Sequence, residues 1–200
     1  MSHYFDETPG APSAESTVIV ELPDITFTLR TQRGVFSHGR LDPGTAVLLR
    51  HAPAPPSRGE LLDLGCGAGP LALALARRSP HATVWAVDVN ERARSLCATN
   101  ATANGITNVT VGAPDDVPSD VRFDVIWSNP PIRIGKPALH DVLTTWLGRL
   151  TQDGRALLVV HKHLGSDSLQ RWLNAEGWPT IRLTSAKGYR LLEVRGHETA

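Results

Sequence analysis

The sequence predicts an α/β fold: one doubly wound sheet of seven strands, mostly parallel, with an antiparallel hairpin at its C-terminal end and a β-hairpin appendage before it. Three observations predict this fold. Short β-rich runs alternate with helical runs from residue 60 onward, as is typical of a parallel sheet covered by helices on both faces. A glycine-rich turn follows the first of these strands, and acidic or amide side chains follow the second and the fourth.

The glycine-rich turn lies in residues 60–70, where a short apolar run ends abruptly. Glycine is needed where φ is positive or where a ligand approaches bare backbone, and the N–H groups that begin the next helix can bind that ligand. A dinucleotide site places glycine at the first, third and sixth positions of this turn. Here glycine occupies the first, third and fifth positions and proline the sixth: Gly65, Gly67, Gly69 and Pro70. The spacing favours a different Rossmann-like cofactor site.

The second strand, residues 82–87, ends at Asp88. An acid at this strand end is placed to accept both hydroxyls of a ribose. Together with Asp63 before the glycines and Asn90 after the second strand, it forms a pattern that resembles class I S-adenosylmethionine-dependent methyltransferases. A glycine turn with an ordinary helix cap is the alternative, and residues 65–69 alone do not decide between the two.

A third element decides between the cofactor site and the ordinary glycine turn. The strand at residues 123–128 runs into Asn129-Pro130-Pro131, which resembles the Asn-Pro-Pro-aromatic motif of methyltransferases that act on planar amino nitrogens. Two prolines hold the chain extended, so the Asn side chain and a backbone carbonyl can face one ligand. Alone, a rigid turn would be the simpler interpretation. Three such signals in order, each at a predicted strand end, favour an amino-group methyltransferase.

The organisation follows from the same patterns. We predict a flexible arm at residues 1–16, a hairpin and capping segment at residues 17–58, and the methyltransferase domain at residues 59–196. The expected helices span residues 46–50, 71–78, 91–104, 138–150 and 168–175. The expected strands span residues 17–22, 25–30, 60–64, 82–87, 109–111, 123–128, 155–160, 181–185 and 189–194.

Composition bounds the class of protein. With 200 residues, 41% hydrophobic and 20% charged, the chain suits one globular domain with a substantial core. No apolar run reaches the length of a membrane span, and no signal-peptide core is present. Cys66 and Cys97 are the only cysteines, which favours a reducing cytoplasm. A formal net charge of zero argues against nucleic-acid binding by bulk charge but permits a local basic patch.

Five segments occur in one order: residues 34–37, 42–45, 63–70, 88–93 and 129–133. Together they resemble the methyltransferase small domain family, whose RsmC-like members methylate the exocyclic N2 of guanine in small-subunit ribosomal RNA. The resemblance runs from about residue 34 to residue 194. Two features depart from it: no counterpart of the additional N-terminal domain of the RsmC-like enzymes precedes the match, and Ile132 stands where many relatives have an aromatic residue.

The resemblance implies roles for individual residues. S-adenosyl-L-methionine, which leaves as S-adenosyl-L-homocysteine, is the implied cofactor, without a metal. Its implied binding residues are Phe36, Thr45, Asp63, Gly65, Cys66, Gly67, Asp88, Val89, Asp115 and Asn129. Asp63 and the glycines would cradle the methionine part, Asp88 the ribose and Asp115 the adenine amino group. A core role for Phe36 and a helix cap at Asp42 stay open.

The implied catalytic residues are those of the strand-end motif: Asn129, Pro130, Pro131 and Ile132. The Asn129 side chain and the Pro130 carbonyl would accept hydrogen bonds from the amine. Arg133, Lys136 and Lys162 follow the carboxyl ends of predicted strands, where ligands bind in such sheets. They are candidates for RNA phosphate contacts, and plain solvated charge is the alternative.

The expected partner is ribosomal RNA as substrate, and the expected location is the cytoplasm, without attachment to a membrane. The expected oligomeric state is a monomer or weak dimer. Two other substrates stay open, a protein glutamine and an adenine amino group. A degenerate cofactor-binding module that serves as an RNA-binding or assembly protein is the alternative from another class. The intact Asp63, Asp88 and Asn129 argue against that last alternative.

Overall fold

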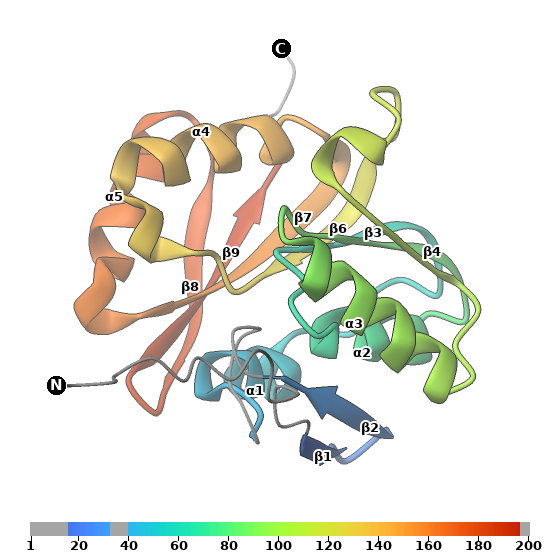
Figure 1. Ribbon diagram of the computed structural model, residues 1–200. Helices are drawn as coiled ribbons and strands as arrows, with labels where there is room; N and C mark the ends of the chain where they lie inside the picture. The colour runs from blue at the N-terminus through green and yellow to red at the C-terminus, as the bar shows by residue number, and fades with distance from the viewer. Residues whose placement is uncertain (1–15, 33–39, 197–200) are drawn as a thin grey trace, which may run out of the picture.

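The computed structural model describes residues 16–32 and 40–196 (Figure 1). Its main sheet has seven strands in the order β5-β4-β3-β6-β7-β9-β8. These strands are β3 (Arg58–Leu64), β4 (His81–Val87), β5 (Val109–Gly112), β6 (Phe123–Ser128), β7 (Leu150–His161), β8 (Thr180–Ala186) and β9 (Tyr189–Arg195). Strands β3 to β7 pair in parallel, and β9 is antiparallel to both of its neighbours. The predicted fold class is confirmed.

Helices cover both faces of this sheet (Figure 1). They are α1 (Pro43–His51), α2 (Pro70–Arg78), α3 (Glu91–Ala103), α4 (Lys136–Leu147) and α5 (Ser166–Ala175), with short 3-10 turns η1 (Pro114–Asp116), η2 (Ile132–Ile134) and η3 (Lys162–Leu164). Leu61 belongs to the core cluster that includes residues of α1, α2 and α3, whereas Leu62 belongs to the cluster that includes residues of α4 and α5. Neighbouring strand residues point to opposite faces, so a central strand buried on both faces needs an unbroken apolar run.

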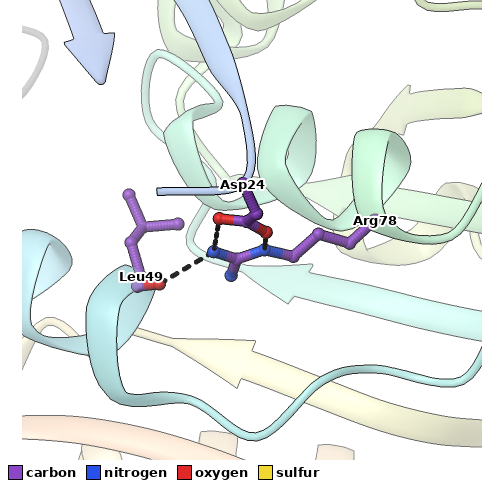
Figure 2. A network of polar contacts seen from close by, with 3 residues as sticks. All are labelled: Asp24, Leu49 and Arg78. Atoms are coloured by element: carbon purple, nitrogen blue, oxygen red, sulfur yellow. Dashed lines mark hydrogen bonds and ion pairs between the residues drawn. The ribbon is translucent and has the colours of Figure 1, made fainter. Parts of the chain in front are cut away.

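The N-terminal hairpin forms a separate two-stranded sheet of β1 (Ser16–Glu21) and β2 (Thr26–Thr31). It is attached to the main body through side chains of α2 and α3. Figure 2 shows Arg78 forming a bidentate ion pair with Asp24 of the hairpin, at 2.7 and 3.0 Å, while it also donates to the carbonyl of Leu49 at 3.0 Å. The hydrogen bond from Arg78 lowers the pKa of Asp24. The hairpin, α1 and α2 are thereby joined at one point.

Three predicted boundaries are wrong by more than two residues. The helix expected over residues 46–50 begins at Pro43 as α1. The helix expected over residues 138–150 ends at Leu147, and β7 begins at Leu150 rather than at residue 155. The early part of β7 contains Gly154, where an added Cβ would lie 2.7 Å from the carbonyl oxygen of Phe123. Only glycine allows this close backbone approach, and the pairing register shifts there. A glycine in polar sequence predicts a loop, so tertiary pairing overrides the local signal.

Candidate active site

A cavity of about 560 Å³ opens at the carboxyl ends of β3, β4 and β6, the edge where ligands bind in doubly wound sheets. Most of the predicted site residues lie in its wall: Thr45, Asp63, Gly65, Cys66, Gly67, Asp88, Val89, Asn129, Pro130 and Pro131. These residues come from segments far apart in the sequence. The fold therefore brings the glycine turn, the ribose acid and the Asn-Pro-Pro segment to one place.

The glycine turn between β3 and α2 uses its glycines for different reasons. Gly65 and Gly69 both have positive φ, at 78° and 88°. A Cβ added to Gly65 would meet nothing within 4 Å, so this position faces open space, whereas one added to Gly69 would lie 2.5 Å from the Sγ of Cys97. The Cys97 thiol and burial raise the pKa of the neighbouring Cys66. Gly69 lets α3 approach the turn, and Gly65 leaves room for a ligand.

Asp63 at the end of β3 is a fully buried carboxyl group. Its Oδ2 accepts a hydrogen bond from the Ala72 N–H at 2.8 Å, while Oδ1 has no partner among the described residues. Burial, with a smaller contribution from the charge of Asp88, raises the pKa of Asp63 to about 8. A buried carboxyl group with a raised pKa and a free oxygen in a cavity wall is suited to a cationic ligand group.

Asp88 at the end of β4 is held differently. Its Oδ2 accepts from the Gly67 N–H at 3.0 Å and its Oδ1 accepts from the Asn90 N–H at 2.9 Å. A carboxylate has about four acceptor positions, so each oxygen can accept one more hydrogen bond. Asp88 is half-buried, and Val89 beside it is 83% exposed on the rim of the cavity. This carboxylate is oriented for a ligand with two neighbouring hydroxyls.

Asn129 at the end of β6 is fixed by the segment that begins α1. Its Nδ2 donates to Asp42 Oδ2 at 2.7 Å and to Thr45 Oγ1 at 3.2 Å. The same Asp42 oxygen accepts from the Thr45 N–H at 2.9 Å and caps α1. The helix cap that the sequence left open for Asp42 is therefore present, and Asp42 also lines the cavity.

The two prolines form a tight bend. Pro131 has φ −75° and ψ 72°, and the Ile132 N–H donates to the Pro130 carbonyl at 2.8 Å. This is an inverse γ-turn. A carbonyl oxygen has two lone pairs, so the Pro130 carbonyl keeps one for a ligand.

Several predicted residues lie outside the cavity wall. Asp115 is exposed, and its neighbour Pro114 lines the cavity instead. Ile132 packs against the core on the α4 side. The three basic candidates are exposed at the carboxyl edge: Arg133, Lys136 and Lys162. Phe36 lies outside the described residues, and the roles of all these residues stay predictions.

Other wall residues were not anticipated from the sequence. One group lies on α4: Asp141, Val142, Thr145 and Trp146. Nothing local marks them, because an amphipathic helix following the motif does not say which residues reach the cavity. The buried Asn100 of α3 does not line the cavity, but it is a second residue that the sequence did not indicate; its Nδ2 donates to the carbonyls of Ala68, at 2.9 Å, and Arg30, at 3.0 Å. An asparagine in mid-helix is the signal that would have found it.

Comparison with known proteins agrees with this geometry. The sequence model of the methyltransferase small domain family matches residues 26–193 of this chain. The chain belongs to this family. The uncharacterised protein YbxB of Bacillus subtilis is 34% identical over 196 residues, which cover 96% of this chain and 98% of YbxB. Ribosomal RNA small subunit methyltransferase C of Pseudomonas syringae pv. tomato is 41% identical over 133 residues, which cover 65% of this chain and 40% of that enzyme.

Among solved structures, a T. thermophilus 16S rRNA N2 methyltransferase (RsmC) in complex with AdoMet and guanosine superposes with a TM-score of 0.79 at 25% identity. The match covers 96% of this chain and 53% of that one. The chain thus spans about half the length of the ribosomal RNA methyltransferases that it matches. It is an S-adenosylmethionine-dependent methyltransferase by family, so the predicted family, enzyme class and cofactor are confirmed.

The cavity residues fit this cofactor. The unpartnered, buried Asp63 Oδ1 complements an ammonium group, and the open space at Gly65 would be filled by any side chain at that position. Asp88 complements a ribose diol. In the described part of the chain, no group of three His, Cys, Asp or Glu side chains could hold a metal ion. No helix within residues 16–32 and 40–196 is long and apolar enough to cross a membrane.

Proposed function

We propose that the protein methylates the exocyclic N2 amino group of a guanine in ribosomal RNA. The single observation that carries the choice of an amino group is the arrangement of Asn129. Both acceptors that its amide N–H groups meet lie on the α1 side, so its oxygen is left to accept from a substrate. The Pro130 carbonyl beside it has one remaining lone pair. Two acceptors on consecutive residues that both line the cavity complement an NH₂ group, which has two donors.

These acceptors address the chemical difficulty of the substrate. The lone pair of a guanine amino group is delocalised into the ring, which makes the nitrogen a poor nucleophile. Hydrogen bonds from both N–H groups to Asn129 and Pro130 favour the pyramidal geometry in which the lone pair is localised. S-adenosylmethionine, when bound, supplies an activated methyl group. Holding the amine in line can contribute up to ~7–11 kcal/mol of the barrier, and the amine proton leaves to solvent.

The substrate class rests on the relatives. Proteins named ribosomal RNA small subunit methyltransferase C match 65–78% of this chain, and the T. thermophilus neighbour was solved with guanosine. The exposed Arg133, Lys136 and Lys162 are proposed to contact RNA phosphates. The cytoplasmic location and the oligomeric state, a monomer or weak dimer, stay predictions.

Mass spectrometry of nucleosides tests the proposal. Small-subunit ribosomal RNA from a strain lacking the gene should contain less N2-methylguanosine than RNA from its parent. The purified protein with a deuterium-labelled methyl donor should restore the missing nucleoside in that RNA. The proposal would be contradicted if N2-methylguanosine were unchanged and the label were found on adenine or on a protein glutamine in isolated ribosomes. The substrate would then be that adenine or that glutamine.

A further inference from the structure

The Asn129 amide presents a question of orientation. The oxygen and the NH₂ group of a carboxamide are nearly the same size, so packing does not choose between them; hydrogen-bond partners do. If the NH₂ group faced the substrate amine, two donors would meet and no acceptor would be available. The proposed function therefore requires a device that selects one of two nearly equivalent orientations.

Asp42 supplies that device. A carboxylate accepts hydrogen bonds and cannot donate them, so the 2.7 Å contact with Asp42 Oδ2 requires the Nδ2 of Asn129 on that side. The Thr45 hydroxyl at 3.2 Å adds a second acceptor. We propose that Asp42, assisted by Thr45, is a positioning residue that fixes the Asn129 amide with its oxygen toward the substrate. This inference rests on the proposed acceptor role of that oxygen.

The carboxylate itself is held in place by α1. Asp42 Oδ2 also accepts from the Thr45 N–H at 2.9 Å, so one oxygen serves the helix cap and the Asn129 amide together. The helix is anchored by Leu48 and Leu49, which are buried. Gly44 lies directly against Tyr189 of β9, where an added Cβ would be 2.7 Å from the Tyr189 ring. The position of the acceptor therefore depends on packing between α1 and β9.

Three substitutions separate the helix cap from the positioning role. Asp42→Ser keeps a good N-cap but withdraws the oxygen from Asn129 by about one bond length, ~1.3 Å. Asp42→Asn keeps an oxygen that can accept from both Thr45 and Asn129, but it loses the charge and replaces the other oxygen with an NH₂ group. Asp42→Ala removes both contacts. Asp24→Ser is the matched control, because it removes a carboxylate that pairs with Arg78 outside the cavity wall.

Nuclear magnetic resonance of the full-length protein gives a readout that needs no substrate. The side-chain NH₂ signals of Asn129 are assigned as those lost in Asn129→Ala. In Asp42→Ser we expect hydrogen exchange of this NH₂ group to become about tenfold faster, because a charge-assisted hydrogen bond is lost. Asp42→Asn and Asp24→Ser should leave it within about threefold of the parent. Unchanged exchange in Asp42→Ser would overturn the inference.

Kinetics then test whether the orientation matters. On small-subunit ribosomal RNA from a strain lacking the gene, Asp42→Ser should lower the single-turnover rate roughly tenfold to a hundredfold and leave cofactor affinity unchanged. Asp42→Asn should lose about fivefold. In an Asn129→Ala background, Asp42→Ser should cost nothing further, because its target is gone. A full additional loss there would mean that Asp42 acts only through the fold and would overturn the inference.

The two proposals fail separately. If the parent protein transfers no methyl group to guanine in that RNA, the proposed function fails, while the exchange measurement still tests how Asn129 is held. If the parent methylates guanine and Asp42→Ser retains its full rate, the positioning role fails and the proposed function stands.

Discussion

The two halves of the cavity are built in different ways. The cofactor half consists of a glycine turn and two acids at the ends of neighbouring strands β3 and β4, held by backbone N–H groups of nearby residues. The amine half depends on one side chain, Asn129, whose partner Asp42 is 87 residues away in the sequence. We propose that the first half binds the cofactor through contacts between residues at most 21 positions apart. We propose that the second half orients the substrate amine through a contact between residues 87 positions apart. We therefore expect changes in the first half to alter affinity and changes in the second to alter rate.

The largest effect is expected at Asn129. Asn129→Ala removes an acceptor whose contribution grows as the amine changes geometry during attack. The single-turnover rate should fall by about 10²–10³, while calorimetry should show unchanged affinity for S-adenosylmethionine. A folded variant with the parental rate would show that this strand end is only a rigid turn.

Asn129→Asp sharpens the same contrast. The new carboxylate would face Asp42 Oδ2, which lies 2.7 Å from the present Nδ2, and like charges at this distance raise the pKa of the pair. At pH 8 we expect the single-turnover rate of Asn129→Asp to be equal to or lower than that of Asn129→Ala. The rate should recover as the pH falls, because a shared proton restores one donor toward Asp42. A rate independent of pH between 6 and 8, relative to the parent, would contradict this.

Asp88 is expected to show the opposite behaviour. Asp88→Ala removes a charge-assisted acceptor for the ribose hydroxyls, and such bonds contribute about 1.5–3 kcal/mol, or roughly tenfold to a hundredfold in affinity. Titration calorimetry measures this directly. Asn90→Ser, which keeps a cap for α3, is the control for damage to the helix. Unchanged affinity in folded Asp88→Ala would contradict the ribose role.

Asp63 should make cofactor affinity depend on pH. Its pKa of about 8 means that the free protein holds a proton there at neutral pH, whereas a bound ammonium group requires the carboxylate. Affinity should therefore rise with pH between 6 and 8, by at most about tenfold per pH unit. Calorimetry in buffers of different ionisation enthalpy should detect release of a proton, and Asp63→Asn should abolish both effects. Affinity that falls with rising pH would contradict the proposed contact.

The raised pKa of Asp63 also determines whether the free energy of unfolding rises or falls with pH. The unfolded chain loses the Asp63 proton near the ordinary value of 3.8, but the folded protein keeps it to about pH 8. A raised carboxyl pKa makes the folded state bind more protons, so the free energy of unfolding falls as pH rises through this window. Thermal unfolding of Asp63→Asn should show a weaker decline than the parent between pH 5 and 8.

The smallest effect is expected at the exposed basic residues. Arg133→Ala and Lys136→Ala should weaken RNA binding and flatten its salt dependence by about one unit of slope each, with cofactor affinity unchanged. Arg58 is an exposed arginine at the start of β3, on the opposite edge of the sheet, and Arg58→Ala is the matched control. If Arg133→Ala and Lys136→Ala showed the same salt dependence of RNA binding as Arg58→Ala and the parent, Arg133 and Lys136 would be only solvated charge.

The difference between the two halves also explains what the sequence could predict. Asp63, Gly65 and Asp88 follow strand ends at short, regular spacings, so their meeting follows from the order of parallel strands. The contact between Asp42 and Asn129 depends on how α1 packs against the sheet, which no local pattern describes. The sequence could therefore indicate the segments that line the cavity but not the orientation of the side chain at its centre.

Smaller differences have the same origin. The resemblance implies that Asp115, after β5, contacts the adenine, whereas η1 leaves it exposed and brings Pro114 into the cavity wall; the role of Asp115 stays a prediction. One residue of difference in a short turn decides which side chain faces the cavity. The extension of β7 back to Leu150 likewise depends on its pairing with Phe123, because the intervening residues predict a loop when considered alone.

The division between binding and orientation is tested most directly by raising the concentration of S-adenosylmethionine. Single-turnover rates on the ribosomal RNA substrate would be measured for the parent, Asp88→Ala and Asn129→Ala up to saturation of each variant. We expect Asp88→Ala to recover a rate close to that of the parent at saturation, and Asn129→Ala to remain about 10²–10³ slower at every concentration. Recovery of Asn129→Ala by added cofactor, or failure of Asp88→Ala to recover, would contradict the division.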